Sequence, residues 1–218
     1  MLKTDLHIHS KEDPKDKMKY SVFDVIDKAA KEKFDVIAIT YHEKYFDNTK
    51  AINYAKEKGI LLIPGIEASI KGKEVIIINA DKTAENIKTF EELEEYKKEN
   101  QNCLIIAPHP FYCFSFCLRK KVLKYLSLFD AWEWNSIYLS LINPNKKTNK
   151  LAKRYNKPII ANGDIHLLEI MGNTYSLIDA DKNIESIVDA IKKNKIEIKT
   201  KALSLKQFFK VLFYRDFN

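Results

Sequence analysis

The chain has 218 residues and a formal net charge of +7, from 37 basic and 30 acidic side chains. Its 45% apolar and 31% charged content is that of an ordinary soluble globular protein, with enough length for one sizeable core. No apolar run approaches the length of a membrane span, and the first residues lead into a strand and not into a signal peptide. We therefore expect a cytoplasmic protein with no membrane partner.

The positive net charge suits a polyanionic or phosphorylated partner. It is also the ordinary result of a lysine-rich composition, because lysines occur in many of the expected helices, for example Lys28, Lys31, Lys56, Lys97 and Lys192. Since these lysines do not gather in one stripe, we favour solvated helix faces over a binding surface.

Short β-branched runs alternate with amphipathic segments along the chain. The expected strands span residues 2–8, 35–40, 60–66, 74–79, 103–107, 130–135, 158–162, 174–178 and 195–199. The expected helices span residues 21–33, 48–58, 86–99, 119–128, 144–155, 184–194 and 203–214. This alternation predicts a parallel sheet with right-handed crossovers, and six or seven such units are enough to close a barrel. We expect one α/β barrel domain over residues 1–218.

The end of the chain, residues 203–218, contains an expected helix that is rich in aromatic side chains. Such a helix could dock on a membrane surface. We favour a helix packed on the barrel as a cap, because this arrangement needs no additional partner.

All five histidines lie at or just after the ends of these strand-like runs: His7, His9, His42, His109 and His166. Glu67 occupies the same kind of place after the run at 60–66. In α/β barrels the C-terminal strand ends are where catalytic groups gather, so distant segments would assemble one site. His7 and His9 share one face of the first strand, and two converging imidazoles suit a divalent transition metal.

The three cysteines are odd in number, which argues against a disulfide framework. Cys113 and Cys117 are four residues apart and could be soft metal ligands on a helix. Because aromatic side chains flank both cysteines, we favour buried hydrophobic thiols.

Five short motifs resemble, in order, those of the PHP (polymerase and histidinol phosphatase) domain family. They are Asp-Leu-His-Ile-His-Ser at 5–10, Ala-Ile-Thr-Tyr-His-Glu at 38–43, Pro-Gly-Ile-Glu-Ala at 64–68, Ala-Pro-His-Pro-Phe at 107–111 and Gly-Asp-Ile-His at 163–166. The resemblance runs from the first residues to about residue 180. It implies a distorted (β/α)7 barrel, two or three divalent metal ions (manganese, zinc or iron) and phosphoester hydrolysis.

The resemblance also implies a metal-ligand set, carried over residue by residue. His7, His9 and Asp164 would bind a first ion, and Glu67 would bridge it to a second. His109 would complete the second position together with Glu67.

A third ion would lie between His42 and His166, with Asp13 as a helper from the loop after the first strand. Metals that share a carboxylate and a water lower the pKa of that water and clamp the phosphoryl oxygens during in-line attack. Glu67 would serve as the bridge, and Asp164 or a bound water would handle the proton.

Two positions depart from the family pattern. Tyr41 stands where the family usually has the aspartate of Thr-Asp-His. In the strand after Glu67 the family often has a histidine for the second metal, and the nearest equivalents here are Ile76 and Ile77. With Glu67 and His109 alone, the second position could be weak, water-rich or empty.

Three hypotheses of function follow, and the third is a nucleic-acid-processing role, which would need a basic groove leading to the site. The first is a metal-dependent phosphoesterase acting on a small phosphorylated metabolite, a nucleotide or an oligonucleotide end. The alternative is a catalytically weakened barrel that acts as a binding or regulatory module, with His42 as a hydrogen-bonded structural residue. We favour the enzyme, because all five histidines keep their motif positions, and we expect Glu133 and Asn135 to orient ligands.

Overall fold

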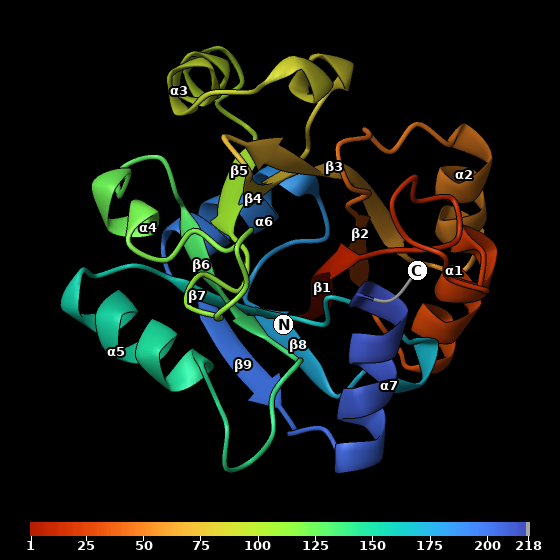
Figure 1. Ribbon diagram of the computed structural model, residues 1–218. Helices are drawn as coiled ribbons and strands as arrows, with labels where there is room; N and C mark the ends of the chain where they lie inside the picture. Colours follow the sequence, from red (N-terminus) through yellow and green to blue (C-terminus); the bar gives the residue numbers. More distant parts are fainter. Residues whose placement is uncertain (217–218) are drawn as a thin grey trace.

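The computed structural model describes residues 1–216, and within them one nine-stranded sheet curls into a nearly closed barrel (Figure 1). The strands are β1 (Leu2–Ile8), β2 (Val36–Ile39), β3 (Leu61–Ile70), β4 (Lys73–Ile78), β5 (Leu104–Ala107), β6 (Ala131–Asn135), β7 (Ile159–Asn162), β8 (Thr174–Ile178) and β9 (Ile196–Thr200). The helices are α1 (Val22–Lys31), α2 (Thr49–Glu57), α3 (Phe90–Glu99), α4 (Lys121–Lys124), α5 (Asn145–Arg154), α6 (Ile184–Lys192) and α7 (Leu205–Asp216), with 3₁₀ turns η1 (Lys82–Asn86) and η2 (Leu168–Ile170). The barrel expected from the sequence is confirmed.

The sheet is mixed, which corrects the expectation of a parallel sheet. Its strand order is β7-β6-β5-β4-β3-β2-β1-β8-β9. The strand β4 runs antiparallel to both β3 and β5, and β8 runs antiparallel to β1 and β9. The link between β3 and β4 is only Lys71 and Gly72, both with positive φ. So short a link leaves no room for a crossover helix, and the chain must reverse there.

The barrel closes between β1 and β7 through hydrogen bonds from backbone amides to side chains, with one backbone bridge between Ile8 and Ile165 beyond the strand ends. The amide of Leu6 donates to Asn162 Oδ1 at 3.0 Å, and the amide of Gly163 donates to Asp5 Oδ1 at 2.9 Å. A Cβ on Gly163 would lie 2.5 Å from Asp5 Oδ2, so the close approach requires glycine. Burial raises the pKa of Asp5 to about 7. This seam places the end of β1 against the segment that follows β7.

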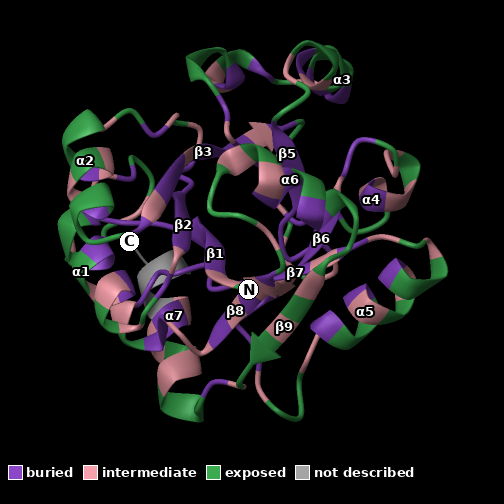
Figure 2. Ribbon diagram, turned by 180° about the vertical axis from the view of Figure 1, so that it is seen from behind, coloured by how far each residue is buried: buried purple, intermediate pink, exposed green. Residues whose placement is uncertain are grey.

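The apolar core occupies the barrel interior and the layers between the sheet and its helices (Figure 2). Small and branched side chains of the strands, among them Ala38, Ile63 and Ile106, fill the interior and pack with Ile187 of α6. Around the outside of the barrel, α1 and α2 pack on one part of the sheet, and α3, α4 and α5 pack on another (Figure 1). Because apolar side chains fill the interior and the helix layers, the polar side chains of the strands gather at the C-terminal end of the barrel.

Two expected helices are shorter than predicted. The helix expected over 86–99 begins at Phe90, because Thr89 and Glu92 form a capping box there. The helix expected over 119–128 is reduced to the single turn α4, since Arg119 has a positive φ and Lys120 provides no side-chain cap.

Helix α7 contacts the core cluster around α1 and α2. Val211 is fully buried, Phe208 packs on the same core cluster, and Leu205 and Phe209 are each 64% exposed. Residues 217–218 of the expected C-terminal segment lie outside the described part. None of the helices within residues 1–216 is long and apolar enough to cross a bilayer. The cytoplasmic location and the single-domain organisation stay predictions.

Candidate metal centre

The five histidines meet at the C-terminal end of the barrel, each buried and none more than 8% exposed. The ring of His9 lies 5.0 Å from that of His7, 4.6 Å from His42 and 4.5 Å from His166, measured between centroids. The ring of His109 lies 5.9 Å from that of His7. The strand-end positions in the sequence therefore converge on one site, as predicted.

The carboxylate of Glu67, on β3, is the centre of this cluster. Its Oε2 lies 3.3 Å from His7 Nε2, 3.5 Å from His9 Nε2 and 3.3 Å from His42 Nε2. Its Oε1 lies 3.5 Å from His109 Nε2. Within the described residues, neither oxygen has a partner with the geometry of a hydrogen bond. One buried carboxylate thus faces four imidazole nitrogens without being bonded to them.

The opposite ring nitrogens of three histidines are held by carboxylates. His7 Nδ1 lies 2.8 Å from Glu133 Oε1, and Asp13 Oδ2 lies 2.9 Å from His9 Nδ1 and 3.0 Å from His42 Nδ1. A carboxylate at Nδ1 fixes the proton there and directs the Nε2 lone pair away from it. These Nε2 atoms consequently point at Glu67 as ligands would.

The other two histidines have different supports. His166 Nδ1 lies 3.0 Å from Asp164 Oδ1. His109 Nδ1 lies 3.3 Å from the sulfur of Cys117.

Cys117 is buried, as expected, but Cys113 is exposed, so the prediction of two buried thiols was wrong for Cys113. The aromatic flanks of Cys113 do not enclose it because its segment is a surface loop.

The electrostatics of the site favour positive charge among the histidines. Burial lowers the pKa of His7, but Glu133, Asp164 and Glu67 outweigh burial and raise that pKa well above its usual value. Burial raises the pKa of Glu67, but His7 and His42 outweigh it and hold that pKa well below its usual value. The Glu67 carboxylate is therefore ionised, and its buried charge needs positive charge beside it, which protonated histidines or metal ions can supply.

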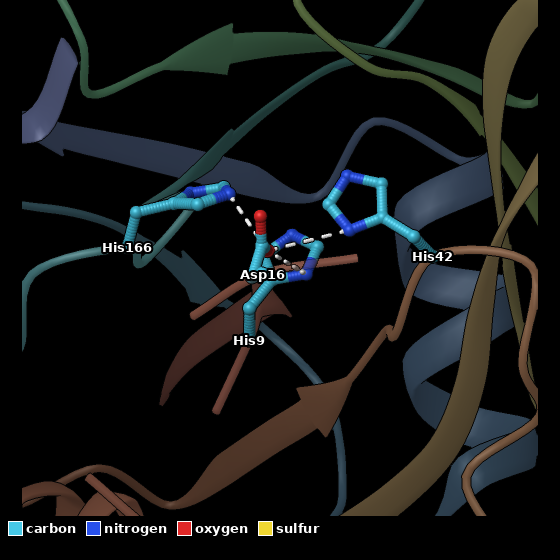
Figure 3. A group of neighbouring side chains, drawn as sticks. All are labelled: His9, Asp16, His42 and His166. Carbon is cyan, nitrogen blue, oxygen red and sulfur yellow. Dashed lines mark ion pairs between the residues drawn. The ribbon is translucent and has the colours of Figure 1, made fainter. Parts of the chain in front are cut away.

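Ligand atoms at metal-binding spacing form three overlapping groups. They are His7 with His9 and Asp164; His42 with Glu67 and Glu74; and His9 with Asp16, His42 and His166, the atoms of each lying within 4.8 Å of one another. Figure 3 shows the third group, in which Asp16 Oδ2 lies 3.2 Å from His166 Nε2 and 3.4 Å from His42 Nδ1. Imidazole and carboxylate together suit zinc, manganese and iron.

The spacing around Glu67 also fits divalent metal ions. Two ligands of a tetrahedral zinc ion, each about 2.0–2.1 Å from the metal, lie about 3.3–3.4 Å apart. The separations from Glu67 to the four Nε2 atoms, 3.3–3.5 Å, match this spacing. A charge-assisted hydrogen bond would instead be about 2.7–2.9 Å long.

Asp13, expected as a metal helper, lies behind the histidines. Its Oδ2 contacts the ring nitrogens of His9 and His42 and also accepts the amide N–H of His42 at 2.9 Å. Asp16, three residues further along the same loop, lies in the ligand group instead. Sequence reasoning missed Asp16, since a loop has no periodicity that shows which carboxylate turns inward.

Glu74 was also missed, and it lies where the family histidine was sought. Its Oε2 is 3.3 Å from His109 Nε2, and its Oε1 is 3.9 Å from His42 Nε2. Ile76 and Ile77, the positions considered from the sequence, are buried core residues. Glu74 shares a strand face with Ile76, two residues on, and this alternation was the signal that could have identified it.

Two further expectations concern residues around the ligands. Tyr41 lies outside the ligand groups, and its hydroxyl is 2.5 Å from Ser10 Oγ.

Glu133 accepts the amide N–H of His109 at 2.9 Å besides contacting His7. The amide group of Asn135 donates to Glu133 Oε2 at 2.9 Å and to Asp164 Oδ2 at 2.8 Å. Glu133 and Asn135 thus orient ligand residues, as expected.

Comparison with known proteins agrees with the barrel fold described above. A model of the PHP domain matches residues 5–162, and a PHP-associated model matches residues 143–196. The chain is 29% identical over 214 residues to the uncharacterized protein MJ0417 of Methanocaldococcus jannaschii, a match that covers 93% of this chain and 82% of that protein.

Two solved structures share the fold at low sequence identity. One is a two-domain protein of Bacteroides vulgatus that contains a predicted PHP-like metal-dependent phosphoesterase, with TM-score 0.70 and 18% identity, covering 98% of this chain and 69% of that one. The other is the lesion-specific endonuclease PfuEndoQ of Pyrococcus furiosus, with TM-score 0.65 and 17% identity, covering 90% of this chain and 57% of that one.

Proposed function

Because the chain belongs to the PHP domain family, whose model covers most of it, we propose that it is a divalent-metal-dependent phosphoesterase. The observation that carries this proposal is the Glu67 carboxylate, with the Nε2 atoms of four histidines 3.3–3.5 Å from its oxygens. Its substrate would be a phosphate ester of a small metabolite, a nucleotide or an oligonucleotide end.

In this proposal three metal positions share residues. His7, His9 and Asp164 would hold the first, and Glu67 would supply a carboxylate between it and the second. Glu74 and His109 complete the second position.

Asp16 and His166 would hold the third position, next to His42, whose Nε2 faces Glu67 and Glu74. Asp13 holds the rings of His9 and His42 in place, and does not itself bind the ion. Manganese, zinc and iron all accept this ligand chemistry.

Divalent ions in such a site lower the pKa of a bound water and offset the charge of the phosphoryl oxygens. The protein contributes orientation and a proton acceptor. Asn135 holds Asp164 Oδ2 at 2.8 Å, which leaves Oδ1 on the side of His7, 3.5 Å from its Nε2. Asp164 Oδ1 is therefore directed toward the first position, where its carboxylate would take up the proton of a water bound there.

The observations that favoured a catalytically weakened module no longer do so. The Glu74 carboxylate lies where the family histidine is missing and would serve as a ligand in its place. Asp16 adds a further carboxylate near His42 and His166. Tyr41 turns its hydroxyl to Ser10 and displaces no ligand.

The test is elemental analysis of protein purified without chelator or nickel resin, together with hydrolysis of an aryl phosphate in the presence of manganese, zinc or iron. We expect two or more ions per chain and turnover that is lost in Glu67→Gln. The matched control is Glu95→Gln, an exposed residue of α3, which should keep both metal and activity. One ion or none, with no turnover under any of these metals, would contradict the proposal.

A further inference from the structure

Basic and acidic residues are distributed unevenly over the chain. Between residues 119 and 157 there are ten lysines and arginines but only two acidic residues, Asp130 and Glu133. Asp130 pairs with Lys97 at 2.7 Å, and Glu133 is buried against His7. This stretch carries a net charge of +8, whereas the whole chain carries +7. The lysines are spread along the chain, as the sequence indicated, but the acidic residues are not.

We call the exposed cations on α5, on α4 and just before α4 the α4–α5 face: Arg119, Lys120, Lys124, Lys146, Lys147, Lys150, Lys153 and Arg154. Figure 1 shows α4 and α5 on the same side of the barrel, and Lys120 and Lys147 line one shallow pocket together with Arg119 and Phe111. All eight side chains are exposed. Within residues 1–216, no ion pair neutralises any of them.

On the opposite side of the barrel, acidic residues lie among the lysines, with Asp24 and Asp27 on α1 and Glu57 on α2. On α1 and α2, Lys28 pairs with Glu32 at 2.7 Å and Lys58 pairs with Asp27 at 3.0 Å. Lysines that are neutralised by nearby carboxylates in this way match the solvated helix faces expected from the sequence. The α4–α5 face has no such anions, so its positive potential extends into solvent.

The α4–α5 face begins next to the metal centre. The amide of Arg119 donates to the carbonyl of Pro110 at 2.7 Å, and Pro110 directly follows His109. Tyr112 lines the pocket that Lys120 and Lys147 share, and its ring lies 6.2 Å from that of His109. A chain of phosphates lying on the face would therefore lead toward the cluster of histidines.

We propose that the α4–α5 face binds the phosphodiester backbone of a nucleic acid and leads the strand to the metal centre. The ten residues of α5 span about 15 Å, which is the length of roughly four nucleotides at about 3.4 Å each. A small metabolite would occupy only one end of such a row. That the face guides the strand to the metal centre depends on the proposed function. That it binds nucleic acid does not.

An anionic membrane is the competing partner, and the helix disfavours it. A helix that binds a membrane surface exposes a broad apolar face. On α5 the apolar residues are Leu151 and Ala152, of which Leu151 is half-buried and Ala152 fully buried against the core. The exposed side of α5 offers charge without apolar side chains for insertion.

The test is fluorescence anisotropy of labelled single-stranded DNA, single-stranded RNA and duplex DNA, in the presence of a chelator and over a series of salt concentrations. The test variant is Lys120→Gln/Lys147→Gln/Lys150→Gln. The control variant, Lys31→Gln/Lys50→Gln/Lys56→Gln, removes the same net charge from exposed positions on α1 and α2. Both variants change only exposed side chains, and thermal denaturation checks that both fold.

The α4–α5 variant should bind at least about tenfold more weakly, and its slope of log K against log salt should fall by about 2, because each lysine accounts for about 0.7 of that slope on a single strand. The control should bind as the unaltered chain does. Equal losses in both variants, absence of binding at low salt, or binding to anionic vesicles in place of nucleic acid would overturn the proposal. Because binding is measured with metal removed, this result is independent of whether the chain hydrolyses phosphate esters.

Discussion

The two sides of the metal centre are built from similar ligands but are supported differently. On the side of β1, β2 and β7, carboxylates hold the Nδ1 atoms of His7, His9 and His42 at 2.8–3.0 Å. On the side of β4 and β5, a thiol lies 3.3 Å from His109 Nδ1, and Glu74 is still 14% exposed. Because a charged partner fixes the ring and raises its basicity, we infer that the first side binds metal more tightly.

The largest expected effect is that of Asp13→Asn, which tests the well-supported side. Burial raises the pKa of Asp13, but hydrogen bonds from His42 and His9 outweigh it and hold that pKa well below its usual value, so the residue is an anion at neutral pH. Its loss removes the partner of two rings at once. We expect metal affinity at this side to fall about 100-fold or more, measured by competition with a fluorescent chelator. The exposed Asp47→Asn is the control, and equal affinities in the two variants would show that Asp13 does not orient the histidines.

Glu74→Gln tests the other side by removing a ligand outright. We expect the protein to lose one ion per chain and to keep the rest, because Glu74 belongs to only one of the three ligand groups. Elemental analysis of Glu74→Gln beside Glu95→Gln gives the answer. Unchanged metal content would leave Glu67 and His109 as the whole of the second position.

Cys117→Ala removes the thiol beside His109. We expect a loss of about tenfold in affinity for the second ion only, the low end of what such supporting contacts contribute. Cys103→Ala is the matched control, since Cys103 is equally buried but lies away from the histidines. If both variants lose metal equally, the effect comes from packing and not from the contact with His109.

The smallest effect on metal is expected for Tyr41→Phe. The hydroxyl of Tyr41 bonds to Ser10 Oγ and lies in no ligand group, so metal content should not change. The lost hydrogen bond should lower the free energy of unfolding by about 0.5–1.5 kcal/mol, as seen in denaturant titration. Loss of an ion in this variant would show that the side chain at position 41 contributes to metal binding.

The same contrast explains what could be predicted from the sequence. His7, His42 and Glu67 were identified because each lies at or just beyond the end of an expected strand, where the end of an apolar run fixes the position. Asp164 was assigned only through the resemblance to the PHP family. Asp16 lies in a loop whose path no pattern of apolar residues describes.

Glu74 was obscured by the topology of its strand. A parallel sheet was expected on both sides of the turn at Lys71 and Gly72. In an antiparallel β4 the first residues, and not the last, lie at the catalytic end of the barrel. The direction of one strand therefore decided which of its residues could reach the metals.

The seam between β1 and β7 also determines when the metal centre can form. His7 and His9 come from the first strand made, whereas Asp164 and His166 come from a segment about three quarters of the way along the chain. Contacts so distant in sequence form late in folding, since closing the loop between them carries a large entropic cost. A nascent chain on the ribosome therefore holds incomplete ligand sets until residue 166 has emerged, and full loading with metal marks a barrel that has closed.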